Sequence, residues 1–96
     1  MPAYLIADVE VLDPTGYEEY RKQVPPATIA AFGGRYLARG GALTVLEGSW
    51  SPKRGVILEG PSRDRLKAWY DSPAYVPLRA LRERTTKSNL VMIDGL

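Results

Sequence analysis

The strongest local constraint in this sequence is a short segment with a glycine pair at each end. Gly33-Gly34 precedes residues 35–39, and Gly40-Gly41 follows them. Glycine adopts positive φ angles at little cost, so such pairs favour sharp turns on both sides of a five-residue strand. Side chains alternate across a strand. We therefore predict that Arg35 and Arg39 share one face of a sheet.

The second glycine pair predicts a two-residue hairpin turn. The chain after it, residues 42–46, would then return as a strand beside residues 35–39. This register places Leu43 and Val45 on the core side of the sheet, and both arginines on the opposite side.

Further strands and helices follow from periodicity and from capping residues. Apolar side chains alternate over residues 3–12, which predicts a strand. Asp13-Pro14 is typical of a helix start, because aspartate caps and proline suits the first turn. Ser62 and Ser72-Pro73 predict two later helices in the same way. The predicted strands are 3–12, 35–39, 42–46, 55–59 and 90–94, and the predicted helices are 13–32 with a break at Pro25-Pro26, 62–70 and 72–85.

The order β-α-β-(β)-β-α-β predicts a ferredoxin-like α+β fold, with helices on one face of an antiparallel sheet. The strand that starts at Ala3 is then central, beside the strand that starts at Gly55. The strand after Gly34 lies beyond the latter, and the C-terminal strand pairs on the other side of the first. We expect residues 1–96 to form a single domain.

Two residue types are missing from the 96 residues: cysteine and histidine. Their absence excludes disulfides, thiolate nucleophiles and cysteine-zinc sites, and it removes the commonest general base at neutral pH. We expect no metal and no cofactor. The formal net charge of +2 comes without a nucleic-acid motif, and no apolar run approaches the ~20 residues of a membrane helix. We expect a soluble, cytoplasmic protein that binds neither nucleic acid nor membrane.

Three motifs carry a resemblance to a known family. Residues 33–41, 45–50 and 69–75, together with Arg79 and Arg82, resemble the small bacterial proteins grouped as domain of unknown function 1330. That family is similar to the dimeric α/β-barrel superfamily, whose members pair two ferredoxin-like sheets face to face. The resemblance implies a homodimer with a space between the sheets. It implies no single activity, since the superfamily includes cofactor-independent monooxygenases, muconolactone-isomerase-like proteins and haem enzymes.

The predicted register assigns a polar group to the open face of the sheet, where a second subunit would dock. Asp8 and Glu59 lie there on adjacent strands, and Arg39 is the predicted partner of Glu59. When two carboxyl groups share one enclosed space, the pKa of one of them rises unless a cation compensates their negative charge. One hypothesis is a buried network that holds the dimer in register. The other is a site for a small anionic or polar ligand, bound by Arg39 with Arg35 nearby, and with Asp8 or Glu59 as acid or base.

Two aromatic residues and one proline complete the candidate residues. Tyr75 is predicted to reach a cavity, and Trp50 is predicted to anchor the interface between subunits. Pro2 suggests a less favoured alternative, a tautomerase that uses an N-terminal proline amine after loss of Met1. We therefore expect a small-molecule-binding or cofactor-free enzyme-like protein with its site in the inter-sheet cavity. The alternative is a non-catalytic dimeric interaction module.

Overall fold

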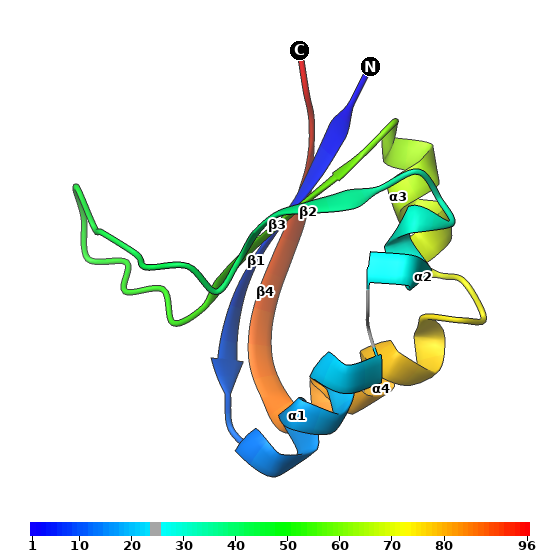
Figure 1. The fold of residues 1–96 in the computed structure, drawn as a ribbon. Coiled ribbons are helices and arrows are strands. Elements are labelled where there is room, and N and C mark those ends of the chain that lie inside the picture. The colour runs from blue at the N-terminus through cyan, green and yellow to red at the C-terminus, as the bar shows by residue number, and fades with distance from the viewer. Residues whose placement is uncertain (24–25) are drawn as a thin grey trace.

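The computed structural model describes residues 1–23 and 26–96, in which the helices and strands follow one another in the predicted order, except that residues 42–46 form no strand (Figure 1). The strands are β1 (Ala3–Val11), β2 (Arg35–Arg39), β3 (Gly55–Gly60) and β4 (Thr86–Asp94), and the helices are α1 (Pro14–Gln23), α2 (Pro26–Ala30), α3 (Arg63–Tyr70) and α4 (Val76–Thr85). Pro25, half of the predicted break in the first helix, lies outside the described residues.

The four strands form one antiparallel sheet in the order β2-β3-β1-β4. All four helices lie on one side of it, and the opposite face is open (Figure 1). The predicted α+β class, strand order and one-sided helix layer are therefore confirmed. Among the described helices, none combines the length and the hydrophobicity that a membrane crossing requires.

The core forms where the inward face of the sheet meets the helices. In β1 the inward side chains, among them Leu5 and Val9, are buried, whereas Ile6 on the other face is partly exposed. Leu66 and Trp69 of α3 pack against the same core. Full burial of one such aliphatic side chain contributes about 1.5–3 kcal/mol, so the alternating pattern of β1 fixes which face meets the helices.

The first two predicted helix caps are confirmed. The Oδ1 atom of Asp13 accepts a hydrogen bond from the backbone N–H of Gly16 at 3.2 Å. The Oγ atom of Ser62 accepts one from the N–H of Arg65, also at 3.2 Å. Each bond satisfies a backbone donor that the first helical turn leaves unpaired.

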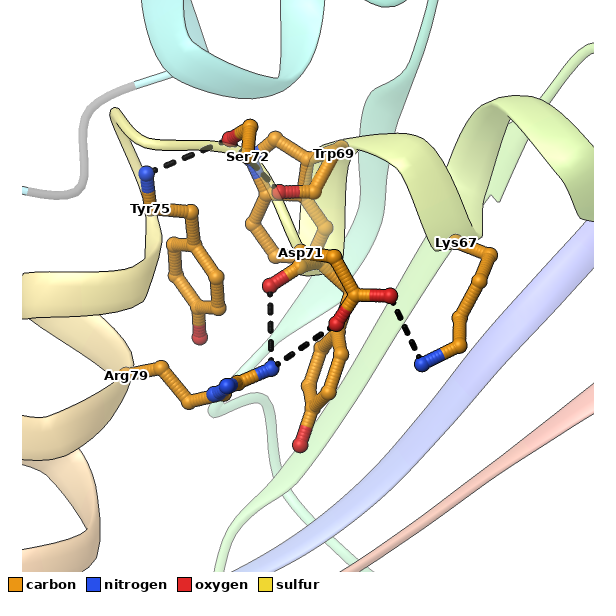
Figure 2. Close-up of polar contacts among 7 residues, drawn as sticks. Lys67, Trp69, Asp71, Ser72, Tyr75 and Arg79 are labelled. Atoms are coloured by element: carbon orange, nitrogen blue, oxygen red, sulfur yellow. Dashed lines mark hydrogen bonds and ion pairs between the residues drawn. The ribbon is translucent and has the colours of Figure 1, made fainter.

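The predicted cap at Ser72 is wrong, because α4 begins at Val76. The Ser72 hydroxyl instead donates to the Trp69 carbonyl at 2.8 Å and accepts from the Tyr75 N–H at 3.2 Å (Figure 2). These bonds close a turn between α3 and α4, so the serine and proline extend the connection. Pro77 falls in the first turn of α4, where its missing N–H costs no helical bond.

The predicted hairpin at Gly40-Gly41 is also wrong. The N–H of Gly40 donates to the carbonyl of Gly55 at 2.8 Å, so β2 closes directly onto β3. Residues 41–54, which we call the arm, leave the sheet and project away from the helices (Figure 1). Leu43 and Val45, predicted for the core, are about half exposed there. Gly40 has a φ of +74°, and the Arg54 guanidinium packs against it, which directs the chain out of the sheet.

Candidate functional site

An irregularity in β2 separates the two arginines that the sequence predicts on one face. Arg35 lies opposite Glu59 and Arg39 opposite Val56, with a register shift between Tyr36 and Ala38. One extra residue in a strand moves every later side chain of that strand to the opposite face of the sheet. Arg39 therefore lies on the helix side with Tyr36, while Arg35 remains on the open face. The predicted shared face is wrong.

The predicted polar cluster on the open face does not form. Arg35, and not Arg39, pairs with Glu59, with 2.9 Å between Nε and Oε1. Asp8 lies opposite Gly55, whereas Glu59 lies opposite Tyr4. Four positions along a strand correspond to about 13 Å, so the two carboxylates do not share a site.

Asp8 instead fastens the arm to the sheet. Its carboxylate accepts hydrogen bonds from the Lys53 backbone N–H at 2.9 Å and from the Trp50 Nε1–H at 3.2 Å. The bond from Lys53 is the main reason that the pKa of Asp8 lies below its usual value. Trp50, the predicted interface anchor, is 65% exposed. Its role between subunits stays a prediction.

A cavity of about 160 Å³ lies on the other side of the sheet, between the strands and the helices. The sheet supplies an aliphatic wall, which consists of Leu5, Ala7, Val9, Val56 and Leu58. The other walls contain five aromatic side chains, which are Tyr17, Tyr20, Tyr36, Trp69 and Tyr75. The cavity is therefore apolar on one wall and rich in phenol groups on the others.

Positive charge dominates the lining. Five basic side chains reach the cavity, namely Arg21, Lys22, Arg39, Arg54 and Arg82, against a single acidic one, Glu18. Glu18 pairs with Arg21 at 3.3 Å. Among the described residues, no carboxylate pairs with Arg39, Arg54 or Arg82. These three cations therefore give the cavity a positive field without a counterion of their own.

Arg82 is the most deeply buried of these cations. Only 5% of the residue is exposed, and its Nε lies 3.5 Å from the hydroxyl oxygen of Tyr75. Burial alone lowers the pKa of Arg82, but the neighbouring tyrosine oxygens outweigh it and raise the pKa. The guanidinium is accordingly charged at every physiological pH.

Arg54 and Arg39 provide positive charge at the root of the arm. The Nε atom of Arg54 is buried and has no hydrogen-bond partner among the described residues. Its guanidinium lies over the ring of Tyr17, 5.9 Å from the centroid, and that of Arg39 lies 4.7 Å from the centroid of Tyr36. Burial raises the pKa of Tyr36, and the hydrogen bond with Arg39 opposes that shift.

A line of tyrosines connects the two basic regions. Tyr17 stacks on Tyr20 with 5.5 Å between ring centroids. The hydroxyl oxygens of Tyr20 and Tyr75 lie 2.8 Å apart, and Tyr75 in turn meets Arg82. Burial, followed by the proximity of Tyr75, raises the pKa of Tyr20, so its phenol is neutral at physiological pH.

The turn after α3 holds Tyr75 in place. Besides the bonds of Ser72, Asp71 lies between two cations, with Lys67 at 2.8 Å and Arg79 at 3.1 Å (Figure 2). These partners, Lys67 first, lower the pKa of the Asp71 carboxyl. The ring of Trp69 stacks on Tyr75 with 4.1 Å between centroids. Tyr75 is only 1% exposed as a result.

Two residues of the predicted site, Tyr75 and Arg39, line this cavity, whereas Asp8, Glu59, Arg35 and Trp50 do not. Pro2 lies apart as well, and its carbonyl accepts a hydrogen bond from Gly95 at 2.7 Å. Sequence reasoning missed Arg54 and Arg82 as cavity residues. The signal for Arg82 was its spacing, since Tyr75, Leu78 and Arg82 recur at helical intervals and place an arginine in an apolar stripe.

Comparison with known proteins identifies a family and a fold. A family model described as "Domain of unknown function (DUF1330)" matches residues 2–96. No curated protein matches. A protein of unknown function from Rhodopseudomonas palustris has a similar structure, with 18% identity and a TM-score of 0.79 over 99% of this chain and 82% of that chain. A dimeric ferredoxin-like protein of unknown function from Thermobifida fusca has 17% sequence identity and a TM-score of 0.72, over 99% of this chain and 92% of that chain.

One similar structure has a described activity. SnoaB from Streptomyces nogalater, a cofactor-independent oxygenase, is 12% identical with a TM-score of 0.62, over 99% of this chain and 93% of that chain. At such identities the likeness establishes the fold and no function.

Proposed function

We propose that this chain, which belongs to the DUF1330 family, binds a small organic anion in the cavity between its sheet and its helices. The observation behind this proposal is the presence of charged guanidinium groups without a carboxylate partner on the cavity wall. Arg82 is buried there, and the Nε of Arg54 makes no hydrogen bond among the described residues. Burying an ion costs several kcal/mol unless an opposite charge compensates it. A bound anion would supply that charge.

The size and the walls of the cavity indicate the body of the ligand. A volume of about 160 Å³ corresponds to roughly five water molecules at about 30 Å³ each, less than a drug-sized pocket. Tyrosine rings and aliphatic side chains surround it, so a flat apolar body fits better than a sugar or a phosphate ester. We therefore take single-ring carboxylates as the first ligands to test.

We propose that this site catalyses a reaction that needs no cofactor. Guanidinium groups in a water-poor space stabilise negative charge that develops on a substrate oxygen. SnoaB, described as a cofactor-independent oxygenase, has the same fold, which is compatible with this class. The proposed site then lies within each protomer and not in the inter-sheet space that the sequence predicts.

The direct test compares benzoate with benzamide, which has the same shape and no charge. Loss of a hydrogen bond to a charged group costs about 1.5–3 kcal/mol, so benzamide should bind about tenfold more weakly or worse. Arg54→Gln should remove most of this preference. Arg35→Gln is the matched control, because it deletes an arginine on the open face. Equal affinity for benzoate and benzamide in calorimetric titration would contradict the proposal.

A second proposal concerns pairing with another copy of the chain. The open face and the arm carry most of the exposed large apolar side chains, among them Ile6, Leu46, Trp50, Val91 and Ile93. Similar structures from Thermobifida fusca and Bacteroides fragilis are described as dimeric. This observation favours a homodimer and keeps the non-catalytic interaction module as the second candidate function.

Val91→Lys tests the pairing, since Val91 lies on the open face opposite Ile6 and is 60% exposed in one protomer. We expect the wild-type protein to sediment as a dimer and this variant as a folded monomer. Leu12→Lys, a similarly exposed position beyond the end of β1, should remain dimeric. A monomeric wild-type protein would exclude the homodimer.

A further inference from the structure

The cavity has two separate basic regions, and this separation constrains the ligand beyond its charge. Arg54 contacts the ring of Tyr17, and Arg82 contacts the hydroxyl of Tyr75. Between them lie the contacts from Tyr17 to Tyr20 and from Tyr20 to Tyr75. A single carboxylate at Arg54 therefore leaves Arg82 uncompensated.

The Tyr20–Tyr75 pair always presents one hydroxyl hydrogen to the cavity. The two phenols carry two hydrogens, and the 2.8 Å bond between their oxygens uses one of them, whichever residue donates. Arg82 is a donor only, so it cannot accept the other. No other hydrogen bond of either hydroxyl is found among the described residues. The free hydrogen and the guanidinium together form a site for an electron-rich oxygen.

We propose that the ligand is a hydroxyaryl carboxylate, with its carboxylate at Arg54 and Arg39 and its phenol oxygen at Tyr20, Tyr75 and Arg82. This inference rests on the proposed anion site and adds the second contact point. The charge of Arg82 favours the ionised form of that oxygen, so the bound phenol should lose its proton to solvent at a lower pH than the free phenol. An opposite charge within ~4–6 Å lowers the pKa of an acid by about 1–3 units.

The test uses 4-hydroxybenzoate labelled with carbon-13 at the phenol carbon, with benzoate as the comparison. We expect wild-type protein to bind 4-hydroxybenzoate about tenfold more tightly than benzoate, since a hydrogen bond to a charged group contributes roughly that factor. The carbon-13 resonance should show the bound phenol ionising at least about one pH unit below the free phenol.

Two variants separate the contact points. Tyr20→Phe/Tyr75→Phe removes both hydroxyls together with the bond between them, and the one remaining group that loses a partner is the Nε of Arg82, whose bond to Tyr75 is long at 3.5 Å. The tenfold preference should fall to about one while benzoate affinity stays within about twofold. Arg54→Gln should weaken both ligands by a similar factor and keep their ratio. Arg82→Lys retains the charge and should retain the shift in phenol ionisation.

The outcomes distinguish this inference from the anion site itself. If neither ligand binds, the proposed function falls. If benzoate binds and the hydroxyl adds nothing, or if the double variant keeps the preference, only the hydroxyaryl assignment is overturned. Thermal unfolding of each variant confirms that it is folded, and the double tyrosine variant carries the test if a variant of Arg82 does not fold.

Discussion

The Nε of Arg82 lies 3.5 Å from the hydroxyl oxygen of Tyr75, in a region of the core where no described carboxylate pairs with it. The tyrosine oxygens around Arg82 favour its charged form and raise its pKa, but they carry no negative charge while the phenols are neutral. A bound anion would supply the counterion that the guanidinium lacks among the described residues.

The missing counterion predicts an unusual effect of Arg82→Met. Replacing buried ionic groups by well-packed apolar side chains of similar volume is often neutral or stabilising by about 1–4 kcal/mol. We expect the variant to unfold at the same or a higher temperature than wild type without ligand. It should keep the stabilisation by benzoate, which at a hundredfold excess over Kd is about 2.7 kcal/mol, and should lose the additional stabilisation by 4-hydroxybenzoate. A variant that is several kcal/mol less stable would instead make Arg82 a structural residue.

The glycine pair at the start of the arm gives a matched pair of substitutions. Gly40 has a φ of +74° and lies against the Arg54 guanidinium, whereas a methyl group added at Gly41 would meet no atom within 4 Å. Left-handed backbone costs a non-glycine residue about 1–2 kcal/mol. Gly40→Ala should therefore lower the free energy of unfolding by at least that amount and weaken benzoate binding by displacing Arg54. Gly41→Ala should do neither, and equal effects in denaturant titrations would refute this explanation of the arm.

The turn that positions Tyr75 predicts a pH dependence. The folded protein lowers the pKa of Asp71, so the group binds a proton less readily in the folded state than in the unfolded state. Its contribution to stability is then present above the unfolded pKa of about 3.9 and is lost as the pH falls through the lower folded value. Asp71→Asn should unfold at a lower temperature than wild type at neutral pH. The difference should shrink on acidification, and a constant difference would show that ionisation of Asp71 is not the cause.

The partner of Glu59 can be decided by two double-mutant cycles. We expect a coupling energy of about 0.2–1 kcal/mol between Arg35 and Glu59, since the Arg35 side chain is 71% exposed and such pairs are weak. The coupling should fall with added salt. Between Arg39 and Glu59 we expect none. Coupling of Glu59 to Arg39 alone would contradict the pairing of Arg35 with Glu59 and the register of β2 described above.

The topology was predictable because its signals are local and repetitive. Alternation along β1 and the capping residues Asp13 and Ser62 need no tertiary information, and each is found as predicted. Ser72 carried the same local signal, yet its hydroxyl bonds to Trp69 and Tyr75 and so belongs to a turn. A capping residue thus predicts a hydrogen bond more reliably than it predicts the next helix.

The site was not predictable from the sequence, because one extra residue in β2 determines which side chains line the cavity. The irregularity between Tyr36 and Ala38 moves Arg39 from the open face to the cavity, and strict alternation cannot show this. The position of Arg54 in the cavity was not predictable either. Arg54 belongs to the arm, and the predicted hairpin placed the backbone of this segment elsewhere. Both errors come from the same short segment, in which glycine permits several backbone routes and tertiary packing selects one.

The proposed position of the anion, between the sheet and the helices and not on the open face, can be observed in a crystal. Crystals of the protein grown with 4-bromobenzoate and measured at the bromine absorption edge suit this purpose, because the anomalous signal locates the ring. We predict one site per protomer, with the carboxylate at Arg54 and the ring beside Tyr17 and Tyr20. Bromine located only on the open face, near Arg35 and Glu59, would contradict an anion site in the cavity.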